Sequence, residues 1–330
     1  MAQSQRRLEL VHLQITKQCN LHCWFCGQWG DKGCFSSKRT VALEISDWQG
    51  VVASLERYSQ NEGNKLSVIL WGGEPLLSAH FEALVRLLAE KGFTIGLVTN
   101  GTLLRNHAEL CKKYISRIYV SIDGVAEVHN SIRGAGVFES VAQQLEGIRG
   151  GKAKLTLMTV MTTEVLENLH DTLTTLEKLE PDEILLQEMI ALTADEISDY
   201  KAWMQQEFDV KAVDIESWYT DKAPERRDHD WYTTWLTQHT FSCPVRHIPH
   251  GAETGRPYCL SPERHLHIAW DGEVSFCTDF TDFSLGNIRS SDLIDLFEGP
   301  RSQDFAQQVR NGKCVTCNHC SWRNSDSFYL

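Results

Sequence analysis

Three cysteines lie close together near the start of the chain, in the stretch TKQCNLHCWFCGQWG at residues 16–30. They are Cys19, Cys23 and Cys26, spaced Cys-x3-Cys-x2-Cys. A structural zinc site takes four ligands, commonly as paired Cys-x2-Cys knuckles, and this triplet fits that pattern poorly. Three thiolates do fit an iron-sulfur cubane, because they can hold three irons and leave the fourth open for a chelating ligand. The triplet therefore predicts a reactive cluster with one open coordination position.

The surrounding pattern indicates how such a site would be held. Between residues 8 and 190, apolar runs alternate with amphipathic stretches, which is typical of parallel strands covered by helices. We expect strands at 8–16, 66–73, 94–100, 117–124, 154–162 and 182–190, and helices at 45–59, 78–92, 104–114, 138–151 and 168–181. This pattern predicts an α/β fold, a partial (β/α)6 barrel whose ligands bind at the carboxyl ends of the strands. The cysteine triplet and the motifs WGGEP, TNG and SIDG all follow such ends.

The triplet CNLHCWFC, placed after the first strand of a barrel, closely resembles the signature of the radical S-adenosylmethionine (radical SAM) superfamily. The resemblance implies a 4Fe-4S cluster on the three cysteines, with SAM chelated to its open iron. Reductive cleavage of SAM would give a 5′-deoxyadenosyl radical, and this radical would abstract a hydrogen atom from an unactivated C–H bond. The resemblance implies that the GGE motif binds the SAM ammonium, that the fourth strand binds the ribose and that an arginine binds the carboxylate. The Gly-Gly, Asn-Gly and Asp-Gly pairs could instead be ordinary turns. The SAM-binding residues implied are Phe25, Gly72, Gly73, Glu74, Asn100, Ser121, Asp123, Arg133 and Gln187.

A second group of cysteines occupies the last quarter of the chain. A hairpin is expected at HLHIAWDGEVSFC (265–277), with Asp271-Gly272 as its turn, and a helix at about 290–308 precedes the tail CVTCNHC. This layout resembles the SPASM auxiliary-cluster extension or its shortened form, the twitch. The resemblance implies one auxiliary 4Fe-4S cluster; a zinc site on the same residues is the alternative. Its ligands would be Cys259, Cys277, Cys314 and Cys317, with Cys320 as the rival for the last position.

Three other cysteines fall outside these groups. Cys111 is expected to be a core thiol, whereas Cys34 and Cys243 could face the active site, with Cys243 as a candidate hydrogen-atom donor. Histidines and acids also gather in DHDW (228–231) and RHIPHG (246–251). They could bind substrate or act as bases, but a solvated loop is the favoured interpretation.

Composition restricts the partners. The net charge of −12 argues against a nucleic-acid partner, and no apolar run is long enough to span a membrane. No signal peptide is recognisable, so we expect a cytoplasmic protein with reduced thiols. The resemblance adds an external one-electron donor such as flavodoxin or ferredoxin.

Together these features predict a radical SAM barrel at 8–208, a connecting region of unknown role at 209–257 and a small twitch/SPASM-like iron-sulfur domain at 258–330. The expected function is oxidation, crosslinking or epimerisation of a peptide or protein side chain. One alternative is oxidation or epimerisation of a carbohydrate or aminocyclitol. An alternative of another class is a non-catalytic, zinc-stabilised binding protein.

Overall fold

The structure is a computed structural model that describes residues 6–29, 33–35, 40–225, 227–251, 258–312 and 314–320. In this part of the chain, ten strands form one curved sheet in the order β10-β9-β8-β1-β2-β3-β4-β5-β6-β7. The strands are β1 (Leu10–Gln14), β2 (Ser67–Trp71), β3 (Thr94–Thr99), β4 (Arg117–Ser121), β5 (Lys154–Met161), β6 (Glu183–Glu188), β7 (Val245–Ile248), β8 (His265–Ile268), β9 (Glu273–Ser275) and β10 (Gly286–Asn287).

The six strands predicted for the barrel are confirmed as β1 to β6, and each pairs in parallel with the next. Two further strands extend this parallel set. β7 pairs with the free edge of β6, and β8 pairs with the free edge of β1. The region between residues 209 and 257, which carried no recognisable motif, therefore supplies β7, and the predicted hairpin joins the barrel directly.

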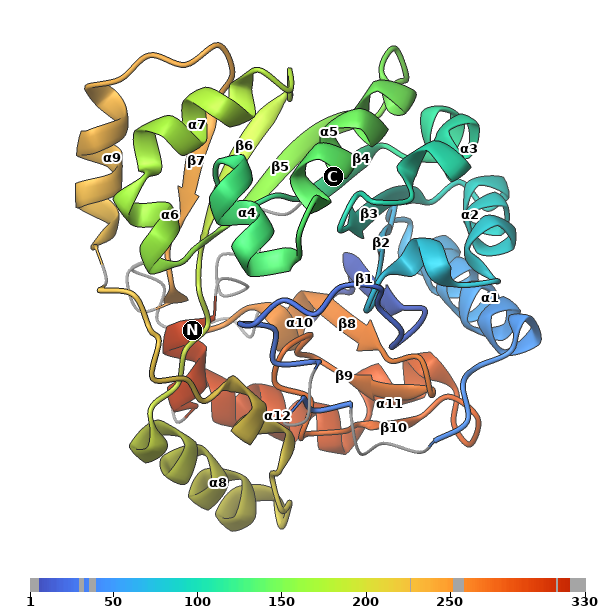
Figure 1. The fold of residues 1–330 in the computed structure, drawn as a ribbon. Helices are drawn as coiled ribbons and strands as arrows, with labels where there is room; N and C mark the ends of the chain where they lie inside the picture. Colours follow the sequence, from blue (N-terminus) through green and yellow to red (C-terminus); the bar gives the residue numbers. More distant parts are fainter. Residues whose placement is uncertain are drawn as a thin grey trace.

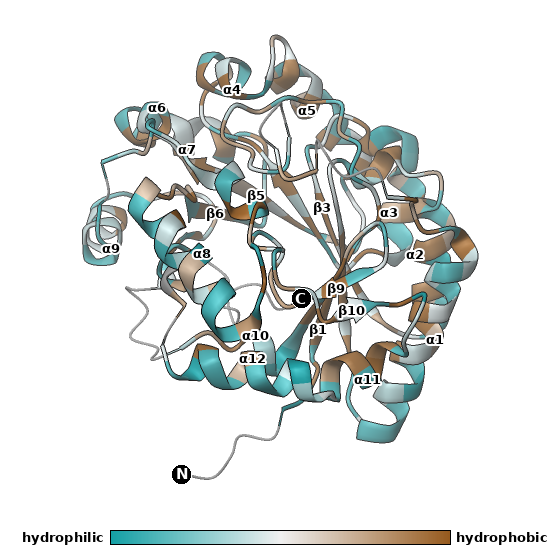
Figure 2. Cartoon of the chain, turned by 90° about the horizontal axis from the view of Figure 1, so that it is seen from below, coloured by the Kyte–Doolittle hydropathy of each residue, from teal (hydrophilic) through white to brown (hydrophobic). Residues whose placement is uncertain are grey.

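Helices surround the strands, as Figures 1 and 2 show. They are α1 (Ile45–Glu62), α2 (Phe81–Glu90), α3 (Ala108–Tyr114), α4 (Ala126–Arg133), α5 (Val137–Leu145), α6 (Thr163–Glu167), α7 (Leu169–Glu177), α8 (Ala194–Phe208), α9 (His229–Thr237), α10 (Ser261–Arg264), α11 (Leu293–Glu298) and α12 (Pro300–Arg310), with 3₁₀ turns at Pro75–Leu77, Leu104–His107, Glu146–Ile148, Asp214–Trp218 and Val315–His319.

Local sequence explains where the long helices begin and end. α1 starts at a capping box between Glu44 and Asp47, and Gly63 closes it in a left-handed conformation at φ 61°. α8 starts at a second capping box, between Thr193 and Glu196. These caps satisfy backbone groups that the first and last turns of a helix leave unpaired.

The helix predicted at about 290–308 is wrong in one respect, because it is two helices. α11 ends at Glu298 and α12 begins at Pro300. Proline has no N–H for the preceding turn and is well suited to the first position of a helix, so the Gly299-Pro300 pair starts a new one. The predicted hairpin is confirmed, with Gly272 at φ 92° in the turn between β8 and β9.

Two apolar layers hold the sheet. The large layer lies between the strands and the helices, and includes Leu13, Val68, Leu97 and Val120. A small layer lies inside the curve of the sheet, where Tyr119, Leu185 and Ile248 pack against Val98 and Met158. The inner layer forms the floor on which the cavity described next rests. None of the helices in the described ranges is both long and apolar enough to cross a membrane.

Candidate functional site

A cavity opens at the carboxyl ends of the parallel strands. Most of the residues predicted from the sequence to bind the cluster or SAM line it: Cys19, Cys23, Cys26, Phe25, Gly72, Gly73, Asn100, Ser121, Arg133 and Gln187. They come from β1 to β4, β6 and the segments that follow them, so parallel pairing brings residues far apart in sequence to one end of the barrel.

The three cysteines occupy the loop after β1. Asn100 Nδ2 lies 3.9 Å from Cys19 Sγ, and Arg133 Nη1 lies 3.7 Å from Cys23 Sγ. Burial raises the pKa of all three thiols, that of Cys26 to about 11. Thiols so placed are deprotonated only when a metal replaces the protons, and they are the ligands that iron-sulfur clusters use. The residues present therefore fit a 4Fe-4S group.

The Gly72-Gly73 pair packs against the backbone that leads into the cysteines. Gly73 N–H donates to Thr16 O (2.9 Å), and Glu74 N–H donates to Gln18 O (2.7 Å). A Cβ atom at Gly72 would lie 2.4 Å from Thr16 O, and one at Gly73 would lie 2.2 Å from Gln18 O. The two glycines thus allow the strand-two motif to hold the start of the cysteine loop.

Glu74 lies behind the cavity wall, with no exposed surface. Its carboxylate accepts hydrogen bonds from Thr99 Oγ1 (2.7 Å), Asn100 N–H (2.7 Å) and Leu76 N–H (3.0 Å). Burial raises its pKa to about 7. In this structure the side chain links the end of β2 to the end of β3, and so orients the segment that carries Asn100.

Asp123 also lies behind the cavity and is fully buried. Its carboxylate accepts from Arg133 Nε (2.6 Å) and from Val160 N–H (2.8 Å). Burial opposes the charge of Arg133, but Asp123 and Cys23 outweigh it and raise the arginine pKa above its ordinary value. Asp123 therefore holds a permanently charged guanidinium in the cavity wall, beside both Cys23 and the Phe25 ring.

The structure does not bring Cys243 to this cavity, contrary to the hypothesis that it could face the active site. Cys243 precedes β7, and Pro244 O accepts from Ile184 N–H near the start of β6. Because β6 and β7 are parallel, this is the amino end of the barrel, opposite the cavity. Cys34 is buried outside the residues that line the cavity, and Cys111 is a core thiol as predicted.

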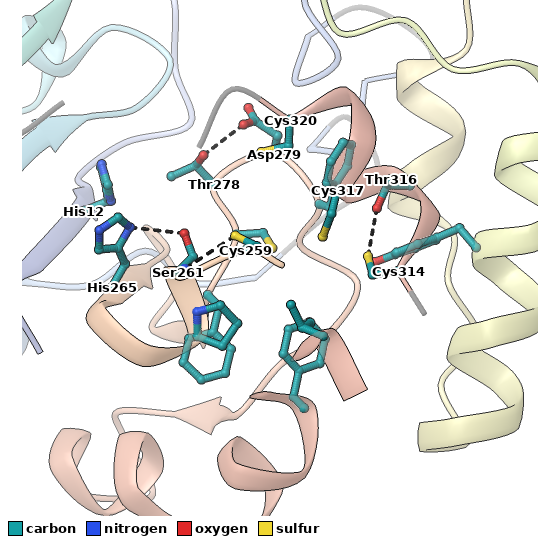
Figure 3. A pocket seen from close by; sticks show the side chains of 17 residues that line it. His12, Cys259, Ser261, His265, Thr278, Asp279, Cys314, Thr316, Cys317 and Cys320 are labelled. Carbon is teal, nitrogen blue, oxygen red and sulfur yellow. Dashed lines mark hydrogen bonds between the residues drawn. The ribbon is translucent and has the colours of Figure 1, made fainter. Parts of the chain in front are cut away.

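The late cysteines converge in a second cavity, shown in Figure 3. Five cysteines line it: Cys259, Cys277, Cys314, Cys317 and Cys320. The neighbouring Cys259 and Cys314 raise the pKa of Cys317, whereas neighbouring Cys317 lowers that of Cys314. Burial raises the pKa of Cys277, and neighbouring Cys320 adds to this effect. Five soft ligands in one buried place fit an iron-sulfur group, with one thiol more than a single cubane needs. Among the described residues, no three metal-ligating side chains are arranged around a single metal ion, but a cubane does not require this because each of its thiolates binds a different iron.

The two cavities share a wall. His12 in β1 and the pair Thr278-Asp279 after β9 line both of them. Trp218 closes the same region, because its indole N–H donates to Asp279 O (2.8 Å) and its ring fills the space beside Gly27. The first cavity therefore adjoins the cavity of the late cysteines.

Sequence reasoning missed several residues that line the first cavity, among them His12, Glu188, Trp218 and Asp279. His12 and Glu188 sit within strands, where polar residues at inward positions were the available signal. Trp218 and Asp279 had none, since each belongs to a segment without a recognisable motif.

Two family models match the chain. The radical SAM superfamily model matches residues 13–176, and the SPASM iron-sulfur cluster-binding domain matches residues 259–321. The chain belongs to the radical SAM superfamily and carries a SPASM domain. Members with these two domains use SAM with a 4Fe-4S cluster and auxiliary iron-sulfur clusters.

Among curated proteins, the tungsten-containing aldehyde ferredoxin oxidoreductase cofactor-modifying protein of Pyrococcus furiosus is 23% identical over 97% of this chain and 89% of its own length. The AdoMet-dependent heme synthase of Oleidesulfovibrio alaskensis is 22% identical over 96% of this chain and 80% of its own.

Solved structures share the fold. SuiB of Streptococcus suis, bound to S-adenosylmethionine, superposes with a TM-score of 0.67 at 16% identity, covering 98% of this chain and 75% of that one. Native anSMEcpe with bound AdoMet gives a TM-score of 0.64 at 20% identity, covering 92% of this chain and 83% of that one.

Proposed function

We propose that this radical SAM enzyme modifies a peptide or protein side chain by removing a hydrogen atom from an unactivated C–H bond. The observation that carries the proposal is the shared wall of the two cavities. A substrate in the first cavity lies beside the cysteine triplet, and His12, Thr278 and Asp279 line both this cavity and the cavity of the late cysteines. Such an arrangement suits an oxidation, in which the substrate must also lose an electron.

The residues of the first cavity have separate tasks in this proposal. Cys19, Cys23 and Cys26 hold the 4Fe-4S cluster, which with bound SAM supplies the 5′-deoxyadenosyl radical. Arg133 binds the SAM carboxylate through its paired donors, while Asp123 holds its planar group in place. Gly72 and Gly73 hold the cysteine loop, and Asn100, Ser121 and Gln187 offer polar groups to the rest of SAM.

In the second cavity, Cys259, Cys277, Cys314 and Cys317 hold one auxiliary 4Fe-4S cluster in this proposal. An electron donor such as flavodoxin or ferredoxin and a cytoplasmic location complete it. Peptide substrates are supported by two structural neighbours with the same fold, SuiB bound to its precursor peptide SuiA and anSMEcpe bound to a peptide.

A low-molecular-weight substrate is the second candidate. The two relatives that match nearly the whole chain carry names that refer to cofactor modification and heme synthesis. The carbohydrate or aminocyclitol alternative belongs to the same category of small substrates.

Anaerobic purification tests the proposal. We expect a brown protein with about eight irons and eight sulfides, and 5′-deoxyadenosine formed from SAM only when reductant is present. The triple variant C19A/C23A/C26A should keep about four irons and form no 5′-deoxyadenosine. A colourless zinc protein would overturn the proposal and favour the non-catalytic alternative.

The substrate class needs a separate measurement. Wild-type enzyme is incubated with deuterated peptides or deuterated small metabolites from the cells that make the protein, and 5′-deoxyadenosine is analysed by mass spectrometry. Deuterium acquired only from the peptide fraction supports the proposal. Deuterium acquired only from the metabolite fraction supports the second candidate.

A further inference from the structure

Three polar side chains form a continuous chain of contacts from the wall of the first cavity towards the surface. Glu188, the last residue of β6, lines the cavity. Its Oε1 lies 2.8 Å from Nε2 of His247 in β7, and Nδ1 of His247 lies 2.9 Å from Nδ1 of His229, the first residue of α9. The His247 side chain has no exposed surface, whereas His229 is partly exposed.

These residues belong to the motifs DHDW and RHIPHG, for which a solvated loop was the favoured interpretation. That interpretation is wrong for both histidines. Parallel pairing places Leu186 of β6 opposite His247 and Gln187 opposite Ile248, so the end of β6 lies beside the imidazole. Asp228 caps α9 by accepting from Trp231 N–H, which fixes His229 at the start of the helix.

The packing around His247 holds its ring in one orientation. The Tyr232 ring stacks on it with centroids 3.8 Å apart and planes inclined by 23°. The His229 ring is inclined by 26° to it, with centroids 5.2 Å apart, so both ring nitrogens at the contact lie close to a common plane. This geometry suits a hydrogen bond between the two imidazoles.

The chemistry of the groups determines which atom carries each proton when Glu188 is ionised. A carboxylate can only accept, so His247 must donate from Nε2. Neutral His247 then has a lone pair at Nδ1, and His229 must donate to it from its own Nδ1. Both N–H bonds therefore point along the chain towards the cavity, and the relay continues outwards through Nε2, the other ring nitrogen of His229.

We propose that Glu188, His247 and His229 form a proton relay between the substrate cavity and the surface. A proton that reaches His229 Nε2 from water, directly or through the groups around His229, lets the Nδ1 proton of His229 pass to His247 Nδ1 and the Nε2 proton of His247 pass to Glu188. Glu188 becomes a neutral acid, both imidazoles end neutral with reversed tautomers, and water has lost one proton. The exact reverse carries a proton from the cavity to water. Glu188 is the group that exchanges the proton with a substrate, and the histidines are positioning residues.

The relay rests on the proposed function only in requiring that the first cavity holds the reacting substrate. It is independent of which substrate binds and of how the clusters are ligated. A test that follows protons in the protein therefore distinguishes failure of the relay from failure of the proposed function.

The test measures exchange of the His247 ring proton. The cluster-loaded protein, labelled with ¹⁵N in its histidine rings, is transferred to deuterated water, and the His247 N–H signal is followed by NMR after assignment through H247Q. A relay exchanges this buried proton by passing it along the chain. We expect H229F, which keeps a ring beside His247 but removes its nitrogens, to slow the exchange by at least about tenfold.

E188Q should slow the exchange as well, because an amide cannot take up the proton that His247 passes inwards. If the contacts only stabilise the fold, both substitutions loosen the site and the exchange becomes faster. An unchanged or faster exchange in either variant therefore overturns the relay. H239F is the matched control: His239 stacks on Trp235 just beyond α9, outside the relay, and its replacement should leave the His247 rate unchanged. Iron content and the unfolding temperature show whether each variant is folded. If H229F does not fold, E188Q alone is sufficient to test the relay.

Discussion

Arg133 donates from Nε to Oδ2 of Asp123 over 2.6 Å, and both side chains are almost completely buried. Breaking a buried ion pair from one side leaves the other charge without compensation, which costs about 3–5 kcal/mol. We therefore expect D123N to lower the free energy of unfolding by several kcal/mol and to weaken SAM binding, because the guanidinium loses its orientation. Urea denaturation and calorimetric titration with SAM measure the two effects.

The matched control for this pair lies on the surface. Arg105 and Glu146 form an exposed ion pair over 2.9 Å, and such pairs contribute about 0–1 kcal/mol. E146Q should leave SAM binding unchanged. If D123N and E146Q had equal effects, the role given to the buried pair would be wrong.

Gly73 is expected to control loading of the first cluster. G73A places a methyl group 2.2 Å from Gln18 O, so the segment leading into Cys19 must move. The variant should lose up to about four irons while keeping the auxiliary cluster. Iron analysis after anaerobic purification measures this, with G50A as the control. Gly50 lies in α1 with open space around it, and its replacement by alanine should stabilise the helix by about 0.5–1 kcal/mol without loss of iron. Full iron in G73A would contradict the prediction.

Glu74 gives the stability a defined pH dependence. Its pKa is about 7 in the folded protein, against an ordinary value of 4.5, because burial disfavours the carboxylate. The folded state therefore holds a proton that the unfolded state releases, and this contribution is complete below pH 4.5 and lost as the pH rises to about 7. A shift of this size corresponds to roughly 3 kcal/mol.

Comparison with E74Q isolates this effect. The glutamine does not titrate, so the stability of the wild type relative to E74Q should fall between about pH 5 and pH 7 and then level off. Urea denaturation across this range measures it. A constant difference would show that Glu74 keeps the same charge in both states.

The late cysteines differ in which other thiols lie near them. Cys259 and Cys314 both raise the pKa of Cys317, which indicates that Cys317 lies close to both thiols. We expect C317A to lose about four irons and C320A to keep them. C243A, at the opposite end of the barrel, should retain both clusters and full SAM cleavage. Loss of iron in C320A but not in C317A would transfer the last ligand position to Cys320.

Periodicity predicted the six barrel strands and the hairpin, and the family resemblance implied part of the lining of the first cavity, because strands depend on local patterns and the motifs follow the common polarity of parallel strands. Glu74 and Asp123 show the limit of this reasoning. Sequence identifies them at strand ends, but whether such a carboxylate faces the cavity or a neighbouring strand depends on rotamers and on backbone N–H groups far away in sequence. The same holds for Glu188 and His247, which are separated by 58 intervening residues and meet only because β7 pairs with β6.

The pairing of β8 with β1 also affects how the chain is made. β1 is complete by residue 14, but the strand that covers one of its edges begins at His265. During synthesis from the N-terminus, that edge remains open until most of the polypeptide has left the ribosome, and open strand edges are sites of mispairing and aggregation. One edge of the first strand is therefore paired only late in synthesis, and truncation before β8 should yield a barrel that aggregates.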